Sequence, residues 1–212
     1  MRMDKRFYVQ QANIEGNKIT LTEDEHSHLS KVLRLRVGDK AECFYDGSDI
    51  LNCVVESITK NYSTLKIENT SKVTSNPKNN VTIFQGLPKL DKLELITQKL
   101  TELGVTALTP FSSTFCVAKQ NDNKIERLKK IVISACKQCG RTKLLEIKPH
   151  LTFKQMLDQL KTYSLVVFAN ETENSTTIKQ IFENNENKQN LKNIAIIIGS
   201  EGGFSKDEIS LL

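Results

Sequence analysis

The protein has 212 residues and a formal net charge of +5, and 38% of its residues are hydrophobic and 26% charged. This composition is typical of a globular protein and excludes the disordered, collagenous and disulfide-scaffold classes. No apolar run reaches the roughly 18 residues of a membrane span, and none of signal-peptide length follows the first residues. We therefore expect a cytoplasmic protein with no membrane segment, built as one large or two modest domains.

The first seventy residues predict a small β-domain. Strands are expected at residues 6–9, 18–22, 40–45, 50–59 and 62–69, with turn residues between them. A helical segment from Asp24 to Leu33 interrupts the strands. This pattern is typical of a small β-barrel or sandwich. Residues 69–80 are polar and have no hydrophobic period, which indicates a linker.

Strands and helices alternate after residue 80, which predicts an α/β domain. Strands are expected at 81–85, 105–109, 144–147, 165–169 and 194–198, and helices at 91–103, 122–139, 153–161 and 177–182, followed by an Asn-rich loop at 183–190. We expect Pro110 to end the second strand. The run from Ile194 to Ile198 is apolar on both faces, as in a central strand of a parallel sheet.

The two longest predicted helices each have an apolar stripe and stop at a glycine. Asp91 and Glu94 have the spacing of a capping box at the start of the first. Its stripe is Leu93, Ile96, Leu100 and Leu103, and that of the second is Leu128, Val132, Ala135 and Cys139.

The basic surplus lies in the middle of the chain. Residues 73–160 carry 14 basic and 7 acidic side chains, whereas residues 1–72 carry 11 of each and residues 161–212 carry 5 and 7. Such a surplus attracts a polyanion, although on charge alone a solvated, lysine-rich face is the better explanation.

The most informative motif follows the last buried strand. Ile198 runs directly into Gly199-Ser200-Glu201-Gly202-Gly203, and a helix with Ser205 and Glu208 as its capping box comes next. Ligands of open α/β sheets bind at the carboxyl ends of strands, and glycines there let the backbone approach a ligand closely. The spacing is neither a dinucleotide fingerprint nor a P-loop. The alternative is a plain tight turn.

The cysteines and histidines predict neither a disulfide framework nor a metal centre. The five cysteines are scattered, which suits reduced thiols. Cys136 and Cys139 have the spacing of a redox motif or of one pair of zinc ligands, but the sequence has no second pair of cysteines to complete a zinc site. His26 and His28 lack the i, i+4 spacing of a zinc helix, so capping or packing explains them better.

Arg34 and Arg36 stand two residues apart, which in an extended segment places both side chains on one face. Arginine binds phosphate through bidentate hydrogen bonds. The alternative is a sheet edge protected by charge.

Four blocks of the chain resemble the RsmE-type 16S ribosomal RNA uridine N3-methyltransferases of the SPOUT superfamily. They are His28-Leu29-Ser30-Lys31-Val32-Leu33-Arg34 with Val37-Gly38-Asp39 and Phe44 to Gly47, then Gln98 to Gly104, then Gln138 to Arg141, and finally Gly199 to Ser205, where Ser200 replaces the family's proline. The blocks occur in order over nearly the whole chain.

The resemblance implies an N-terminal PUA-like β-barrel over residues 1–72, a linker over 73–80, and a SPOUT α/β trefoil-knot domain over 81–212. It also implies S-adenosylmethionine (SAM) as cofactor, a homodimer, and methyl transfer to N3 of one uridine of 16S rRNA in the small ribosomal subunit, without a metal ion. Family members continue into a segment that threads the knot. We find no such segment before Leu212 and therefore expect an incomplete knot in this chain.

Site residues follow from the resemblance and from the motifs together. The cofactor candidates are Phe168, Ala169, Asn170, Glu171, Ile198, Gly199, Ser200, Glu201, Gly202 and Gly203. The RNA-binding candidates are Arg6, Arg34, Arg36, Lys92, Lys99 and Arg141. Arg141 is also a candidate for favouring an anionic uracil, and Glu201 is a candidate general base or a structural hydrogen-bonding group. Two rival hypotheses stay open: a SPOUT methyltransferase with another RNA target, and a non-catalytic RNA-binding protein.

Overall fold

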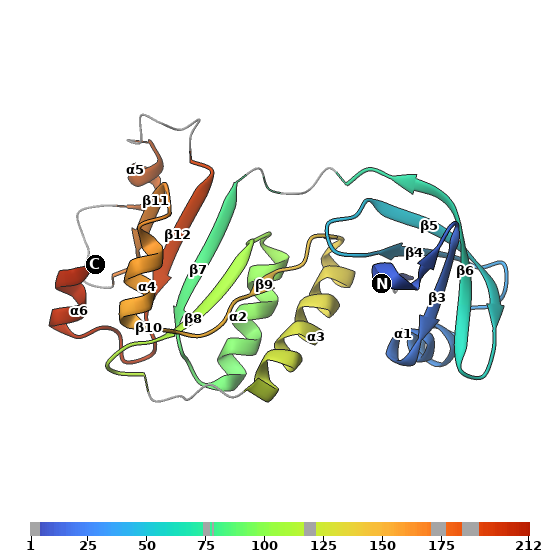
Figure 1. Ribbon diagram of the computed structural model, residues 1–212, viewed down its shortest axis with the longest axis horizontal. Coiled ribbons are helices and arrows are strands. Elements are labelled where there is room, and N and C mark those ends of the chain that lie inside the picture. The colour runs from blue at the N-terminus through green and yellow to red at the C-terminus, as the bar shows by residue number, and fades with distance from the viewer. Residues whose placement is uncertain (1–4, 74–76, 78, 117–121, 171–176, 184–190) are drawn as a thin grey trace. The chain divides into compact units, whose positions relative to one another are not determined.

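The computed structural model describes residues 5–73, 77, 79–116, 122–170, 177–183 and 191–212, which form two compact units (Figure 1). The first unit comprises residues 1–76 and 133–144, and the second comprises residues 77–132 and 145–212. Residues 133–144 therefore group with the first unit, although the expected domain limits place them in the second. Residues 74–76 and 78 of the expected linker, and the Asn-rich loop after residue 183, lie outside the described residues.

One curled six-stranded sheet forms the first unit (Figure 1). Its strands are β1 (Arg6–Tyr8), β2 (Ile14–Glu15), β3 (Lys18–Thr22), β4 (Lys40–Phe44), β5 (Ile50–Ile58) and β6 (Tyr62–Ser71), in the order β1-β4-β5-β6-β3-β2. Only β1 and β4 pair in parallel. The pairing of β5 with β6 shifts register at Asn52/Cys53 and Val55/Ser57. Bulges of this kind increase the local twist of a sheet, which fits the curl.

Alternating side chains build the core of this unit. In β3, Ile19 and Leu21 are buried while Lys18 and Thr22 are exposed, as the two-residue period of a strand requires. A 3-10 turn at Gln11–Asn13 connects β1 to β2. The largest fully buried side chains of the unit are Phe7, Phe44, Ile19, Leu21, Leu29, Leu65 and Val55.

The helical segment of the first unit consists of α1 (Glu23–Ser27) and a π-helical turn (His28–Val32). His26 is buried, with Nδ1 2.8 Å from Ser63 Oγ, so it serves packing. The prediction of an extended segment at Arg34 is wrong, because Arg34 has a φ of 52°, in the left-handed region.

An all-parallel sheet forms the second unit, which confirms the α/β prediction (Figure 1). Its strands are β7 (Asn80–Gly86), β8 (Ala107–Ser112), β9 (Glu146–Ile147), β10 (Leu151–Thr152), β11 (Leu165–Phe168) and β12 (Asn193–Ile198), in the order β10-β8-β7-β12-β11, with β9 also on β8. The helices are α2 (Leu90–Glu102), α3 (Asp122–Cys139), α4 (Phe153–Leu160), α5 (Ile178–Glu183) and α6 (Lys206–Leu211). The last part of α3, from residue 133, groups with the first unit.

The central position predicted for the apolar run 194–198 is confirmed, because β12 pairs with β7 on one side and β11 on the other. Pro110, in contrast, does not end β8. In the β8 ladder, Leu108 faces Ile147 of β9 and Phe111 faces Leu151 of β10. Pro110 pairs with Gln85 of β7 on one side. On the other side it falls between the pairings with these two short strands, at an interruption of the ladder where a proline is tolerated.

Both long helices differ in detail from their predicted patterns. The capping box of α2 is wrong, because the N-cap residue is Lys89 and has no side-chain cap. Leu103 is 77% exposed, and Thr97 and Thr101 occupy the buried stripe. Their hydroxyls donate to the carbonyl four residues earlier, at 2.8 Å each, which satisfies them inside the fold. In α3 the predicted stripe residues Leu128, Val132 and Ala135 are buried, but Cys136 is buried in place of Cys139, which is exposed.

Aromatic rings dominate the core beneath α4. Phe84 of β7 and Phe111 of β8 are fully buried against Met156 of α4. Phe204, which follows the glycine motif, stacks on Phe111 with ring centroids 6.1 Å apart. The core of the second unit therefore reaches directly to the segment between β12 and α6. Its other members are Leu160, Ala195 and Ile197.

Candidate active site

The loop of residues 199–203 lies at the carboxyl edge of the parallel sheet. It begins where β12 ends, at Ile198, which pairs with Gln85 of β7. Gly203 N donates to Ser200 O at 3.0 Å and closes the loop into a tight turn. Gly203 has a φ of 65°, a conformation that favours glycine. We call residues 199–203 the glycine loop.

Gly86, the last residue of β7, packs directly against the glycine loop. A Cβ at Gly86 would lie 2.6 Å from Ser200 N and 2.9 Å from the carbonyl carbon of Gly199. The buried Gln85 side chain donates from Nε2 to Gly199 O at 3.0 Å. The end of β7 therefore holds the start of the loop by close approach and by one buried hydrogen bond.

Glu201 anchors the middle of the glycine loop to the start of α2. Its Oε1 lies 2.9 Å from Lys92 Nζ and 3.5 Å from Lys89 N. The hydrogen bond from Lys92 is the largest of the effects that lower the pKa of Glu201. A carboxylate with a lowered pKa is a poor match for proton abstraction. This geometry favours a structural role for Glu201.

Glu208 joins α6 to the segment that follows β8. Its carboxylate accepts from Thr114 N at 2.8 Å and from Ser205 N at 2.9 Å. Glu208 N donates back to Ser205 Oγ at 3.2 Å, so the predicted capping box of α6 is confirmed. Gly202 lies so close to Phe115 that an added Cβ would meet the Phe115 Cβ at 2.7 Å. Residues 113–115 thus form a third support of the loop.

Stability at acidic pH is expected to depend on Glu208. Burial raises its pKa, but the hydrogen bonds from Ser205 and Thr114 outweigh burial and lower the pKa below its ordinary value of 4.5. A lowered folded-state pKa contributes stability above the unfolded value, and this contribution is lost as pH falls through the folded value. Glu208→Gln should therefore cost about 1–3 kcal/mol of unfolding free energy at pH 7, and less below pH 4.5.

Urea denaturation at neutral and acidic pH measures this difference. Asp207→Asn is the matched control, because Asp207 is an exposed neighbour on the same helix, and it should change the free energy of unfolding little. An equal cost for Glu208→Gln at both pH values would contradict the assignment.

The end of β11 lies beside the start of the glycine loop. Phe168 pairs with Ile197 of β12, and Ala169 N donates to Ile197 O at 3.0 Å. The Phe168 ring meets the Phe204 ring edge-on at 5.1 Å. The structure therefore brings together the cofactor candidates Phe168, Ala169, Ile198 and Gly199, with Asn170 next in the chain. Glu171 lies outside the described residues.

Arg141 belongs to the first unit, whereas Glu201 belongs to the second. Arg141 is buried, and burial lowers the pKa of its guanidinium, an effect opposed by Cys136, Cys139 and Asp46.

Burial also raises the pKa of the Cys136 thiol to about 12. Cys136 is therefore a protonated core thiol at neutral pH, and its motif with Cys139 is not a reactive pair.

The RNA-binding candidates fall into different environments. Arg34, Arg36 and Lys99 are exposed, and Lys99 donates to Glu102 at 2.8 Å. Lys92 is half-exposed and paired with Glu201. Arg6 and Arg141 are buried, with 5% and 6% of each residue exposed.

The described residues carry neither a cluster of metal ligands nor a membrane-spanning helix. No group of three or more His, Cys, Asp or Glu side chains in this part of the chain is arranged to hold a metal ion. Among the helices that the structure describes, none has the length and apolar character of a membrane span.

Residues 74–212 match the model of the RNA methyltransferase domain, and residues 21–68 match the model of the RNA methyltransferase PUA domain. The chain is 32% identical over 209 residues to ribosomal RNA small subunit methyltransferase E of Rickettsia conorii, covering 98% of this chain and 82% of the relative. It belongs to the ribosomal RNA small subunit methyltransferase E family. The Bacillus subtilis member is 31% identical, over 93% of this chain and 79% of its own length.

Solved structures agree with membership of the methyltransferase E family. A Legionella pneumophila protein in complex with SAM has a TM-score of 0.85 and 25% identity, covering 98% of this chain and 84% of its own. Methyltransferase E of Neisseria gonorrhoeae, bound to SAM, has a TM-score of 0.82 at 23% identity with the same coverage. The first unit is accordingly PUA-like, and the second has the SPOUT-type methyltransferase fold.

Three supports of the loop in this methyltransferase E family member escape sequence reasoning. In the sequence, Gly86 marks only the end of an apolar strand. The signal that could have revealed its role is a glycine at the end of one strand together with a glycine motif at the end of another. Glu208 reads only as a helix cap, because its bond to Thr114 spans 94 residues. Phe115 has no motif around it.

Proposed function

We propose that this protein transfers a methyl group from SAM to N3 of one uridine in the small-subunit rRNA. The observation that carries the proposal is a glycine loop held from three sides at the carboxyl edge of the sheet, in a member of the methyltransferase E family. Open α/β sheets bind their ligands at this edge. The uridine and its N3 atom come from the resemblance of the four sequence blocks.

The residues around the loop fit a bound SAM molecule. Ser200 Oγ is buried, with no hydrogen-bond partner among the described residues. Gly203 has open space where a Cβ would lie, so the loop backbone there is accessible to close approach by a ligand. In our proposal residues 168–171 and 198–203 hold the cofactor from two neighbouring strand ends. When bound, SAM supplies an electrophilic methyl group.

The chain itself must hold the uracil and ease the loss of its N3 proton. Arg141 is our candidate for favouring the anionic uracil, since a guanidinium stays protonated at all working pH values. Glu201 holds Lys92 and the loop in this proposal, and does not act as the base. Phosphates of the rRNA contact the exposed Arg34, Arg36 and Lys99, so binding should weaken steeply with salt. We also propose that the protein is a homodimer and acts in the cytoplasm.

Calorimetric titration of the protein with SAM tests the cofactor step. We expect saturable heat with one molecule bound per chain. The absence of binding would contradict the enzyme and favour the non-catalytic RNA-binding alternative. Saturable SAM binding without methylation of small-subunit rRNA would favour a different RNA target.

A further inference from the structure

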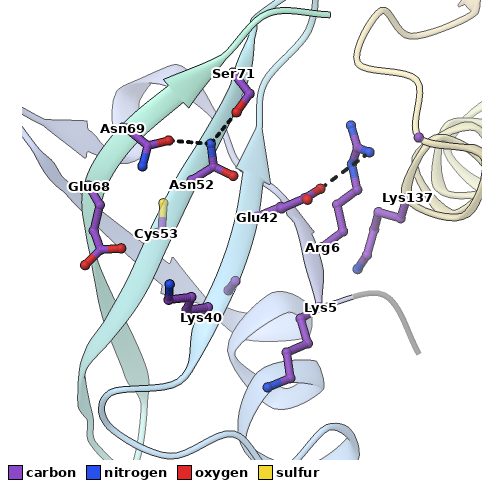
Figure 2. A pocket seen from close by; sticks show the side chains of 12 residues that line it. Lys5, Arg6, Lys40, Glu42, Asn52, Cys53, Glu68, Asn69, Ser71 and Lys137 are labelled. Atoms are coloured by element: carbon purple, nitrogen blue, oxygen red, sulfur yellow. Dashed lines mark hydrogen bonds and ion pairs between the residues drawn. The ribbon is translucent and has the colours of Figure 1, made fainter. Parts of the chain in front are cut away.

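A polar pocket of ≈ 570 Å³ lies in the first unit, apart from the glycine loop (Figure 2). Its walls come from β1, β4, β5, β6 and the end of α3. The volume lies within the roughly 300–1,000 Å³ of small-molecule sites. Four cationic side chains line it against two carboxylates, and these six are Lys5, Arg6, Lys40, Lys137, Glu42 and Glu68.

Arg6 is the unusual member of this pocket. The residue is 95% buried, and its Nε and Nη2 atoms have no hydrogen-bond partner among the described residues. Its one ion pair there is a long one, Nη1 to Glu42 Oε2 at 3.7 Å. A buried guanidinium normally has its donors satisfied, because an unpaired buried charge is costly. A buried cation in the wall of a pocket, with too few partners for its charge, favours the binding of an anion there.

The surroundings hold the Arg6 guanidinium in place. Its Cζ lies 4.9 Å from the centroid of the Phe44 ring, and Nη1 is 3.4 Å from where a Cβ of Gly140 would be. The guanidinium is therefore confined before a ligand arrives, which lowers the entropy cost of binding. Lys137 is already committed, with Nζ 2.9 Å from each oxygen of Glu25. Lys5 and Lys40 are the other cations of the pocket.

The opposite wall carries uncharged polar groups. Asn52 Nδ2 donates to Asn69 Oδ1 at 2.8 Å and to Ser71 Oγ at 2.7 Å, from β5 to β6. Figure 2 shows these three side chains on one side and Arg6 with Glu42 on the other. A ligand that spans the pocket thus meets cations at one end and amide and hydroxyl groups at the other.

We propose that this pocket binds one nucleotide of the RNA strand, with its phosphate at Arg6 and its sugar or base against Asn52 and Asn69. This proposal rests on the proposed function for its choice of RNA. The phosphate replaces the carboxylate of Glu42 on Nη1, because Glu42 is half-exposed, makes only a long ion pair and is free to turn toward water. Arg6 therefore acts in a pocket, unlike the exposed arginines.

Opposite effects of two substitutions test the proposal. Binding of a fluorescein-labelled, single-stranded RNA oligonucleotide to the whole protein is followed by anisotropy. Glu42→Gln removes the competing carboxylate and should tighten binding about 2- to 5-fold. Arg6→Gln removes a charged donor and should weaken it about 10-fold or more. Glu56→Gln is the matched control: Glu56 is half-exposed, pairs with Lys18 at 3.5 Å in the same sheet and lies outside the pocket.

Equal affinities for Glu42→Gln and Glu56→Gln would overturn the proposal, because both remove one negative charge. This comparison decides even if Arg6→Gln fails to fold, which thermal melting would reveal. Uridine monophosphate should compete more strongly than inorganic phosphate, and equal competition would overturn the nucleotide assignment. SAM titration of the same samples separates the two proposals. If SAM binds normally but Glu42→Gln leaves RNA affinity unchanged, only the proposal of a nucleotide in this pocket is contradicted. If the unsubstituted protein does not bind SAM, the proposed function is contradicted.

Discussion

Gly86→Ala is expected to weaken SAM binding strongly while leaving most of the protein folded. The new Cβ would overlap Ser200 N and the Gly199 carbonyl carbon, at 2.6 and 2.9 Å. Both obstructing atoms are backbone, so no side-chain rotation relieves the clash. The glycine loop must shift, and the Gln85 hydrogen bond to Gly199 O is disturbed with it. Overpacking of this kind costs about 1–3 kcal/mol, which corresponds to about a 5- to 150-fold loss of SAM affinity.

Gly16→Ala is the matched control for this substitution. Gly16 has a φ of 59° and open space around its Cβ position, in the turn between β2 and β3. Alanine there costs about 1–2 kcal/mol of backbone strain, and SAM affinity should stay unchanged. Calorimetric titration of both variants gives the comparison. Normal SAM affinity in Gly86→Ala would contradict the placement of the cofactor at the glycine loop.

Phe111→Ala is expected to be the most destabilising single substitution among those considered, with a loss of about 3–5 kcal/mol. Phe111 is fully buried at the end of β8 and belongs to the aromatic cluster with Phe153 and Phe204. Its removal leaves a cavity beneath the segment that carries the glycine loop. Because Phe204 stacks on Phe111, SAM affinity should fall together with stability.

Phe115→Ala makes the same chemical change four residues later, at a side chain that is 48% exposed. It should cost less than about 1 kcal/mol of unfolding free energy. Urea denaturation followed by circular dichroism measures both variants. Comparable losses for the two substitutions would show that the aromatic cluster is not the core of the second unit.

The sequence predicted the elements that are determined by residues close together in the chain. The apolar run 194–198 indicated a strand covered on both faces, and β12 occupies that central position. Ser205 and Glu208 indicated a capping box, and both of its hydrogen bonds form. The glycine loop was found for the same reason, because a buried strand that runs into glycines is visible in the sequence alone.

Features set by distant partners escaped prediction. Pro110 reads as a strand end, and only the gap between β9 and β10 explains why β8 continues through it. Thr97 and Thr101 read as polar, but hydrogen bonds within α2 let them face the interior. Arg6 reads as one more surface cation near the N-terminus. Its burial depends on Phe44 and Gly140, which no local pattern connects to it.

We propose above that the protein transfers a methyl group from SAM to N3 of a uridine in small-subunit rRNA. Small ribosomal subunits that lack this modification are incubated with the protein and methyl-labelled SAM, and the rRNA is digested to nucleosides for mass spectrometry. We predict labelled 3-methyluridine, and much less of it with Gly86→Ala at the same SAM concentration. A different labelled nucleoside, or no labelled nucleoside from subunits treated with a protein that binds SAM, would contradict the account.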